Sequence, residues 1–562
     1  MHYQDWINDL SLGEFFDYQA DKMPAQKALI TPDQGNFTFG ALKDFSDQVA
    51  RAMMSVGVKK GDKIGVWAHN IPEWVFLFLG ISKLGAIMVP INTNARSRDL
   101  AYYLKTAEVK VLFLVSKING TDYKEIFKKA IPDLRVFSSG EVASEEFPLL
   151  KKVIVIGESA TTGAGFLNFE DLLKEASKVR KSDLPFFKGK ISPSDPVMIK
   201  FTCGMTGYSR GAVLTHFGLI NNGLPSAKNQ NLGSSDVLCL PIPFHYIFGF
   251  WMGLVTCFLT HTPVAILPKY TVLEVLKLLE EKRCTAFYGV PTMFADILNH
   301  AEFSRFNLKS LRTGIMSGDF CPPELIQQTI ETMPVPELTI LYGSTEVGVA
   351  TQTSCREKRR EKILYTVGEP VEGMEVKIIN PQTGENVLPG NIGEVCVRTP
   401  LMMQGYYNMP QETAEIIDQD DWFHTGDLGR KDEDGFYCIT GRRRNMLIRG
   451  GENIYPQEVE KYLLSFPGVR DARVVGVPSR RLGEEAFAYV KTNNGSVSSA
   501  QSIREYFRNE ISRHNIPRWI TLVEQFPGEK KGEIIDRNTL RQEAIKEIKS
   551  AEKHPLEIIY PG

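Results

Sequence analysis

Three stretches of the sequence place small, flexible residues beside groups that can bind a nucleotide. The first, CGMTGYSRGAVLTH (203–216), has glycines at positions 204, 207 and 211, hydroxyl groups on Thr206 and Ser209, and a cation at Arg210. Glycines at this density let backbone N–H groups turn inward around an anion, and the cation adds charge. The spacing matches neither the Walker A motif nor the dinucleotide-binding fingerprint. The stretch therefore predicts either an anion-binding loop or an ordinary tight turn.

The second stretch, LYGSTEVG (341–348), stands at the end of a predicted strand. It offers an aromatic ring at Tyr342, small hydrogen-bond donors at Ser344 and Thr345, and a carboxylate at Glu346. A ring can stack on a purine, hydroxyl groups can bind phosphate, and a carboxylate can hold Mg²⁺. This combination favours a nucleotide site that includes a metal ion.

The third stretch covers residues 422–460. Within it, Asp427 is suited to a ribose diol, and Arg442 is suited to a sugar or a phosphate. The alternative interpretation is a turn-rich linker between domains that carries ordinary surface charge.

The elements that must position these groups alternate in type. Short apolar runs such as KIGVWAH and AIMVPIN are separated by helix-length segments such as IPEWVFLFLGISKLG, and a second series of this kind begins near Pro196. Such alternation is typical of parallel sheet built from βαβ units. After Gly373 the pattern changes to strands joined by turn dipeptides, which predicts hairpins. The predicted fold is therefore α/β: a large N-terminal domain (1–441) of two parallel-rich sheets plus a small β unit, and a smaller α+β C-terminal domain (442–562).

Composition limits the kinds of partner. The 562 residues include 65 basic and 67 acidic side chains, so no overall field favours nucleic acid or a membrane surface. The eight cysteines are scattered and never spaced as C-x-x-C, which argues against a zinc site. The apolar stretch 248–268 is interrupted by His261 and Pro263, so a buried helix, a turn and a buried strand are expected there, with no integral membrane segment. The first thirty residues show no signal or transit pattern, and we expect a cytoplasmic protein.

Taken together, in this order and at these separations, the three stretches resemble the adenylate-forming superfamily of acyl-CoA synthetases, adenylation domains and luciferases. The segments LPIPFHYIFG, FYGVPTMFADILNHAEFS, CPPELI and RGGENIYPQEVE look most like the medium-chain acyl-CoA synthetase branch. The resemblance implies a mobile C-terminal lid and a ligase that uses ATP and Mg²⁺. It would activate a fatty or aromatic carboxylate as acyl-AMP and pass the acyl group to coenzyme A.

The resemblance also implies roles for individual residues. Tyr342 would stack on adenine, Gly318 and Asp319 would border it, and Asp427 and Arg442 would hold the ribose. Glu346 would bind Mg²⁺, Thr206 and Thr345 would contact phosphate, and His245 would lie between the acyl pocket and the CoA tunnel. Arg444 occupies the hinge position, and Gly451 would line the tunnel. The remaining residues expected around the nucleotide are Thr202, Cys203, Gly204, Met205, Gly207, Ser209, Arg210, Gly343 and Ser344.

The sequence departs from the family pattern in the phosphate loop. Where the family typically has T-S-G-T-T-G-x-P-K-G, this chain has T-C-G-M-T-G-Y-S-R-G. Cys203 and Met205 replace hydroxyl donors, and Arg210 replaces a compact ammonium group with a planar guanidinium. We expect this loop to hold an anion less well.

A second departure concerns the adenylation lysine, which the family places directly after glycine in P-x-x-x-x-G-K. This chain has PGEKKGEI, so Glu533 occupies the lysine position, and Lys531 is the nearest possible substitute. A glutamate ~4 Å from another anion would repel it by ~4 kcal/mol at an effective dielectric constant of about 20. The leading prediction is a ligase with weakened adenylation. Two alternatives remain: an acyltransferase supplied with acyl-adenylate or thioester by an upstream adenylating enzyme or an acyl carrier, and a non-catalytic acyl-nucleotide-binding protein.

Overall fold

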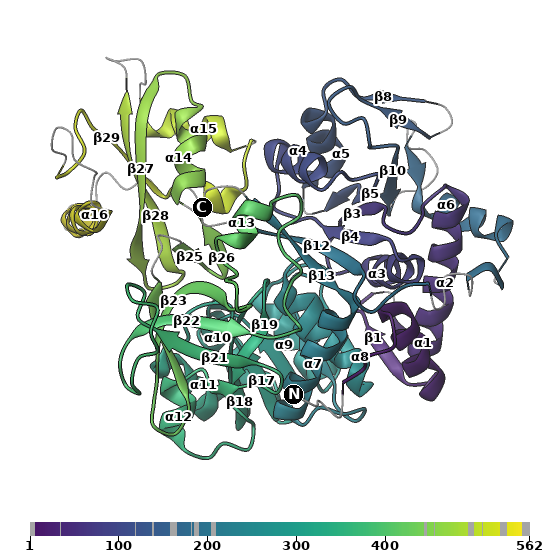
Figure 1. Ribbon diagram of the computed structural model, residues 1–562, viewed down its shortest axis with the longest axis horizontal. Coiled ribbons are helices and arrows are strands. Elements are labelled where there is room, and N and C mark those ends of the chain that lie inside the picture. Colours follow the sequence, from purple (N-terminus) through teal and green to yellow (C-terminus); the bar gives the residue numbers. More distant parts are fainter. Residues whose placement is uncertain are drawn as a thin grey trace. The chain divides into compact units, whose positions relative to one another are not determined.

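The computed structural model describes residues 6–33, 35–118, 120–137, 140–157, 166–180, 182–184, 190–203, 209–442, 447–454, 456–492, 499–508, 510–528 and 537–552. The chain forms two compact units. The first comprises residues 1–95, 100–202 and 210–441, and the second comprises 442–562 with the short segments 96–99 and 203–209. Each unit is described separately below (Figure 1).

One sheet of the first unit contains seven strands within the described residues. Its order is β11-β10-β5-β3-β4-β12-β13, and the paired strands β3, β4, β5, β10 and β12 run parallel. The predicted alternation of strand and helix is confirmed here, because each apolar run became a strand and the segment between β3 and β4 became helix α3. The strands are β3 (Lys63–Trp67), β4 (Ile87–Pro90), β5 (Val111–Val115), β10 (Lys152–Ile156), β11 (Leu167–Asn168), β12 (Pro196–Cys203) and β13 (Ser209–Thr215).

The second sheet of this unit contains nine strands in the part of the chain that the structure describes, in the order β2-β1-β15-β14-β16-β17-β18-β19-β20. Its centre, from β15 through β14, β16 and β17 to β18, is parallel, whereas β19 and β20 are antiparallel additions. The strands are β1 (Lys27–Ile30), β2 (Asn36–Thr38), β14 (Leu238–Leu240), β15 (Val264–Ile266), β16 (Ala286–Gly289), β17 (Thr313–Met316), β18 (Glu337–Ser344), β19 (Gly348–Gln352) and β20 (Glu369–Pro370).

Local sequence explains where the helices begin and end. Helix α9 begins after Thr271, whose side chain accepts a hydrogen bond from the Glu274 N–H, and α3 begins with Pro72 and ends at Gly85 with φ 64°. The helices of the first unit are α1 (Leu12–Lys22), α2 (Phe39–Ser55), α3 (Pro72–Leu84), α4 (Ser97–Thr106), α5 (Tyr123–Ala130), α6 (Phe169–Glu175), α7 (His216–Gln230), α8 (Thr256–Thr260), α9 (Val272–Glu281), α10 (Pro291–Leu298), α11 (Pro323–Thr332), α12 (Arg360–Tyr365) and α13 (Pro410–Ala414).

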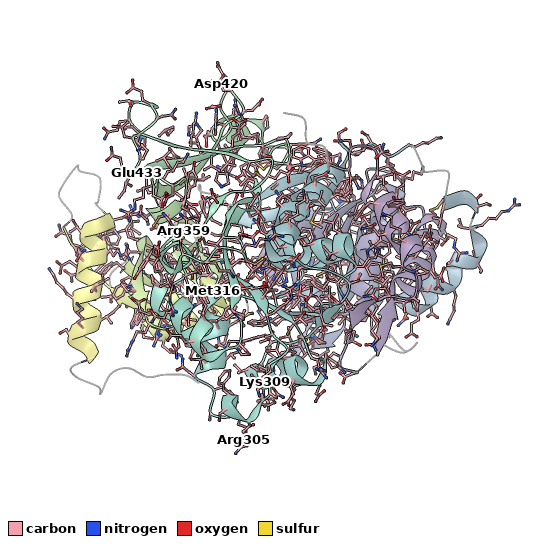
Figure 2. The ribbon with its side chains drawn as sticks, turned by 90° about the horizontal axis from the view of Figure 1, so that it is seen from below. Arg305, Lys309, Met316, Arg359, Asp420 and Glu433 are labelled. Atoms are coloured by element: carbon pink, nitrogen blue, oxygen red, sulfur yellow. The ribbon has the colours of Figure 1, made fainter. Side chains whose placement is uncertain are left out.

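The apolar stretch 248–268 is mostly buried, as expected. It forms a π-helix over Phe248–Val255, then α8, then strand β15. Among the described residues, no helix is both long and apolar enough to cross a membrane. Figure 2 shows the charged residues Arg305, Lys309 and Asp420 at the outside of the first unit, and Met316, which is fully buried, inside it.

The hairpins expected after Gly373 are also present. The strand order is β21-β22-β23-β24, and β22 pairs antiparallel with both β21 and β23. The strands are β21 (Glu375–Ile379), β22 (Gly393–Arg398), β23 (Phe423–Lys431) and β24 (Tyr437–Arg442). This small β unit carries Asp427 on its third strand.

The second unit has its own core, formed where α14 and α15 pack against a sheet. The sheet consists of β25 (Leu447–Arg449), β26 (Glu452–Ile454), β27 (Val469–Ser479), β28 (Gly483–Thr492) and β29 (Trp519–Leu522). Its helices are α14 (Pro456–Leu464), α15 (Ala500–Phe507) and α16 (Arg537–Glu552). The expected fold class, a parallel-rich α/β part with a smaller α+β part, is therefore confirmed.

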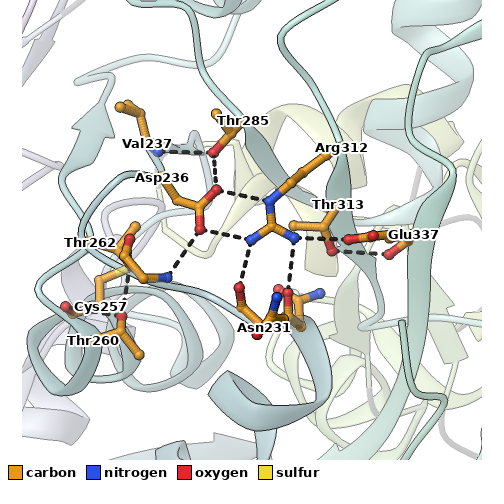
Figure 3. A network of polar contacts seen from close by, with 12 residues as sticks. Asn231, Asp236, Val237, Cys257, Thr260, Thr262, Thr285, Arg312, Thr313 and Glu337 are labelled. Carbon is orange, nitrogen blue, oxygen red and sulfur yellow. Dashed lines mark hydrogen bonds and ion pairs between the residues drawn. The ribbon is translucent and has the colours of Figure 1, made fainter. Parts of the chain in front are cut away.

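A polar network holds the amino ends of the parallel strands together (Figure 3). The Arg312 guanidinium donates to Asp236 through Nε at 2.9 Å and Nη2 at 2.7 Å, and to Glu337 through Nη1 at 2.8 Å. Thr285 donates to Asp236 at 2.7 Å. These residues lie at or just before the first residues of β14, β16, β17 and β18. Burial tends to raise the pKa of Asp236, but hydrogen bonds from Arg312 and Thr285 hold it below its usual value. Because this network occupies the amino ends, the carboxyl ends of the same strands remain available for a ligand. Open α/β sheets usually bind ligands at that edge.

Helix α7 holds the N-terminal segment through its side chains. The His216 ring accepts a hydrogen bond at Nδ1 from the Leu12 N–H, the first residue of α1, at 3.1 Å. Asn221 accepts from the Ile7 N–H at 2.8 Å and donates to the Ile7 carbonyl at 2.9 Å. Since an imidazolium cannot accept at Nδ1, this contact requires neutral His216.

The free energy of unfolding is expected to depend on the charge of His216. Burial lowers the pKa of His216 to about 4, below its ordinary value of 6.5. A histidine whose pKa is depressed in the folded state stabilises the folded protein at pH values above its pKa in the unfolded chain. This stabilisation is lost as pH falls from about 6.5 towards 4. Between pH 7 and pH 4.5, the unmodified protein should lose about 2.5 kcal/mol more than His216→Asn, which keeps an acceptor without titrating. Urea unfolding at both pH values measures this difference, and equal losses in the two proteins would contradict it.

Candidate active site

The end of strand β18 brings together two residues that the sequence separates widely. The Tyr342 hydroxyl donates to Asp427 Oδ2 at 2.7 Å, and Asp427 lies on strand β23 with 9% of its surface exposed. The Thr425 hydroxyl accepts a hydrogen bond from the Asp427 N–H at 3.0 Å. The predicted adenine-stacking ring and the predicted ribose-binding carboxylate are therefore direct neighbours.

The loop after β17 lies beside the same strand end. The Ser317 hydroxyl donates to the Leu341 carbonyl at 2.8 Å, which joins this loop to β18. Gly318 has φ 91°, a conformation that favours glycine, and Asp319 Oδ1 accepts from the Phe320 N–H at 2.6 Å. Because it is tied to the strand that carries Tyr342, the loop can border a base stacked on that ring.

The Glu346 carboxylate is held by two hydroxyl groups. Glu346 Oε1 accepts from the Tyr406 hydroxyl at 2.9 Å and from the Thr202 hydroxyl at 3.1 Å. The backbone is fixed as well, because the Glu346 carbonyl accepts from the Met403 N–H at 2.7 Å. Both side-chain donors are neutral, so the negative charge of Glu346 is not cancelled by them.

Arg210 does not project into solvent. It belongs to strand β13, only 1% of its surface is exposed, and its guanidinium lies 5.1 Å from the centre of the Tyr406 ring. A carboxylate oxygen of Glu415 lies 3.8 Å from Nη2. Ser209, at the start of the same strand, is 4% exposed. Arg210 thus supplies charge from within the fold, beneath Tyr406.

The hydrogen bonding of the Ser344 hydroxyl indicates whether a polar ligand suits the position between Tyr342 and Glu346. Its Oγ is buried and has no hydrogen-bond partner among the described residues. A buried hydroxyl group without a partner is costly, and a ligand oxygen would satisfy it. Gly343 packs so closely on β19 that an added Cβ would lie 2.0 Å from the Gly348 carbonyl oxygen. Thr345 follows in the turn before β19. The residues present therefore fit a polar ligand and, at Glu346, a hard cation such as Mg²⁺.

His245 follows strand β14 at its carboxyl end. The side chain is 1% exposed, and its ring centre lies 4.2 Å from that of Tyr246. Asn70 fixes the preceding backbone by donating to the Ile242 carbonyl and accepting from the Phe244 N–H, each at 2.8 Å. The π-helix Phe248–Val255 begins one turn later. Such helices are rare and often occur at functional sites.

The structure gives only the backbone position, or no description, for several other predicted residues. Cys203 and Arg442 are the last residues of β12 and β24, and their side chains are not described. Gly451, with φ 87°, lies between β25 and β26 of the second unit. The predicted site residues that lie outside the described ranges are Gly204, Met205, Thr206, Gly207, Arg444, Lys531 and Glu533.

Tyr406 was not predicted from the sequence. It stands in GYYNMP, where an aromatic pair after glycine gives no indication of which partner either ring has. Met402, Met403 and Gln404, just before this pair, line a cavity of about 690 Å³ that also includes the ion pair between Arg398 and Glu375. Only the folded chain shows that Tyr406 contacts Glu346.

Comparison with known proteins finds matches over most of the chain. The profile of the family described as AMP-binding enzyme matches residues 16–407, and the profile of the AMP-binding enzyme C-terminal domain matches residues 458–533. The Bacillus subtilis (strain 168) protein YngI, whose name assigns it provisionally to the acyl-CoA synthetases, is 36% identical over 95% of this chain and 97% of its own. Mouse mitochondrial medium-chain acyl-CoA ligase ACSF2 is 33% identical over 95% of this chain and 87% of its own.

The fold is shared with solved structures. A double mutant of o-succinylbenzoate CoA synthetase (MenE) from Bacillus subtilis, bound to a product analogue, has a TM-score of 0.77 and 24% identity. The match covers 95% of this chain and 98% of that one. At this level of identity, the likeness concerns the fold alone.

Proposed function

The chain belongs to the AMP-binding enzyme family, and from this premise we propose that it is an acid–thiol ligase of the acyl-CoA synthetase type. Its substrates are a fatty or other hydrophobic carboxylic acid, ATP and coenzyme A. The acid is first joined to AMP, with release of pyrophosphate, and the acyl group then passes to the thiol of coenzyme A. The relatives named as acyl-CoA synthetase and medium-chain acyl-CoA ligase support this assignment, because they match nearly the whole chain.

The observation that carries the proposal is the group of polar atoms at the end of β18. Tyr342 and Asp427 form one pair, Glu346 lies four residues beyond Tyr342, and the Ser344 hydroxyl between them has no partner among the described residues. In this assignment Tyr342 and Asp427 bind the base and the ribose, and Ser344 and Thr345 donate to the α-phosphate. Glu346 holds Mg²⁺, which would reduce the negative charge on the phosphates.

We propose that the two half-reactions, acyl-AMP formation and thioester formation, proceed at different rates. The AMP-binding groups are present, whereas the groups that serve pyrophosphate and carboxylate attack are altered at Met205 and Glu533. In the family, the lysine replaced by Glu533 stabilises charge during adenylation, and thioester formation from acyl-AMP does not use it. Glu533 therefore slows the first half-reaction and spares the second.

The same substitutions favour a second candidate function. An acyltransferase that receives acyl-adenylate from another enzyme would need the AMP-binding groups and His245, but no adenylation lysine. This candidate differs from the first in one property: the protein would bind acyl-AMP and remain indifferent to MgATP.

Thermal unfolding with ligands tests both candidates. A non-hydrolysable acyl-AMP analogue should raise the melting temperature, since a ligand at 100 times its Kd stabilises by about 2.7 kcal/mol. MgATP should raise it less. Asp427→Ala should reduce both shifts, whereas Asp420→Ala, an exposed carboxylate seven residues earlier, should leave them unchanged. A shift with the analogue alone supports the acyltransferase, and no shift with either ligand would refute both assignments.

A further inference from the structure

Tyr406 contacts both Arg210 and Glu346, the carboxylate that we assign to the metal ion. Its hydroxyl donates to Glu346 Oε1 at 2.9 Å, and its ring lies over the Arg210 guanidinium at 5.1 Å. The side chain is 7% exposed. The residue is therefore largely buried, and it contacts both the Arg210 guanidinium and the Glu346 carboxylate.

The backbone holds Tyr406 firmly at this place. Its N–H donates to the Thr413 hydroxyl at 2.9 Å, and it pairs with Ala212 of β13 as an antiparallel bridge. The neighbouring Tyr407 N–H donates to the Gly211 carbonyl at 2.8 Å. Since the same strand carries Arg210, the ring and the guanidinium are fixed relative to each other.

The hydrogen bonds to Glu346 are unevenly distributed. Thr202 and Tyr406 both donate to Oε1, and no described residue donates to Oε2. Two neutral donors on one oxygen orient a carboxylate without neutralising it. A cation over an aromatic ring also withdraws electron density, which makes the phenol a better donor. Groups that orient a metal ligand in this way commonly change metal affinity by about 10-fold to 100-fold when removed.

We propose that Tyr406 is a positioning residue that orients Glu346 for a divalent cation, and that Arg210 acts on the site through Tyr406. This inference rests on the proposed function, because it takes Glu346 as the ligand of Mg²⁺. The inference adds Tyr406 to the residues of the site. It also gives Arg210 a different role from the phosphate contact that the sequence suggested. Arg210 would tune the donor to the metal-binding carboxylate instead of contacting phosphate itself.

The adjacent tyrosine provides a matched control. The Tyr407 hydroxyl also donates to a glutamate, Glu108, at 2.6 Å, and its ring also lies near a cation, with Lys63 Nζ 5.2 Å from the ring centre. Tyr406→Phe and Tyr407→Phe each remove one hydroxyl bonded to a carboxylate and keep the ring. They differ in which carboxylate loses its donor.

The experiment measures the Mg²⁺ concentration that gives half of the ATP-induced rise in melting temperature, together with the melting temperature without ligand. Tyr406→Phe should require about 10-fold more Mg²⁺ than the unmodified protein. Tyr407→Phe should match the unmodified protein. Thr202→Val removes the other donor to Oε1 and should shift the requirement in the same direction, so it serves as a second variant if Tyr406→Phe is poorly folded. The rise produced by the acyl-AMP analogue without Mg²⁺ should be equal in the unmodified protein and the two phenylalanine variants.

Each result is decisive. If the unmodified protein shows no Mg²⁺-dependent response to ATP, the assignment of Glu346 fails, and the inference fails with it. If the unmodified protein responds and both phenylalanine variants need the same Mg²⁺ concentration as it does, only the inference about Tyr406 is overturned. A loss of the acyl-AMP response in Tyr406→Phe would also overturn it, because the defect would then not be specific to the metal.

Discussion

Glu533→Lys is expected to raise the rate of acyl-adenylate formation by about three orders of magnitude. Removing the repulsion of ~4 kcal/mol that we propose between Glu533 and the reacting anions would correspond to about 10³-fold at 1.36 kcal/mol per tenfold. The attraction supplied by the new lysine would add to this. The measurement is the single-turnover rate of acyl-AMP formation from MgATP and a carboxylic acid, compared between the unmodified protein and Glu533→Lys.

Two further variants separate charge from other effects of the substitution. Glu533→Gln removes the negative charge without adding a positive one, and it should recover an intermediate rate. Lys531→Ala should leave the slow rate unchanged if Lys531 takes no part. Rapid adenylation by the unmodified protein that is lost in Lys531→Ala would contradict the role given to Glu533, because Lys531 would then be replacing the family lysine.

Glu346→Gln is expected to lower the rate of adenylation by about 100-fold, which corresponds to about 2.7 kcal/mol of transition-state stabilisation. The amide oxygen of glutamine can still accept from Thr202 and Tyr406, so the local structure should persist. The negative charge needed to hold Mg²⁺ is lost, however. Adenylation is best compared between Glu533→Lys and the double variant that carries both Glu533→Lys and Glu346→Gln. The adenylation rate of Glu533→Lys is expected to be high enough for a 100-fold decrease to be resolved.

The second half-reaction provides the control for this prediction. Thioester formation from supplied acyl-AMP and coenzyme A releases no pyrophosphate, so Glu346→Gln should slow it less than threefold. An equal loss in both half-reactions would mean that Glu346 supports the structure of the site as a whole. Unchanged adenylation would mean that the metal is held elsewhere.

Much of the fold follows from local sequence. The apolar runs beginning at Lys63 and Ile87 became β3 and β4, and the segment between them became α3, because continuous apolar runs are typical of strands buried on both faces. The turn dipeptides after Gly373 correctly predicted the antiparallel β unit. Strand order was not predictable in this way, since it depends on pairings between residues far apart in sequence, such as β1 with β15.

Only part of the candidate site could be proposed from the sequence, because some of its contacts also join residues far apart in the chain. Tyr342, Ser344 and Glu346 belong to one short stretch, so their types and spacing already indicated a nucleotide site. The contacts of Tyr342 with Asp427 and of Glu346 with Tyr406 join residues 85 and 60 positions apart, and no local pattern encodes them. Arg210 illustrates the same limit: its charge could be read from the sequence, but its burial beneath Tyr406 could not.

The most direct test of the account compares the two half-reactions in the unmodified protein. Single-turnover rates would be measured for acyl-AMP formation from MgATP and a hydrophobic acid, and for acyl-CoA formation from the same supplied acyl-AMP. We predict that the second rate exceeds the first by at least about 100-fold, because in the proposed function Glu533 opposes only adenylation. Adenylation as fast as thioester formation, or the absence of acyl-CoA from supplied acyl-AMP, would contradict the account.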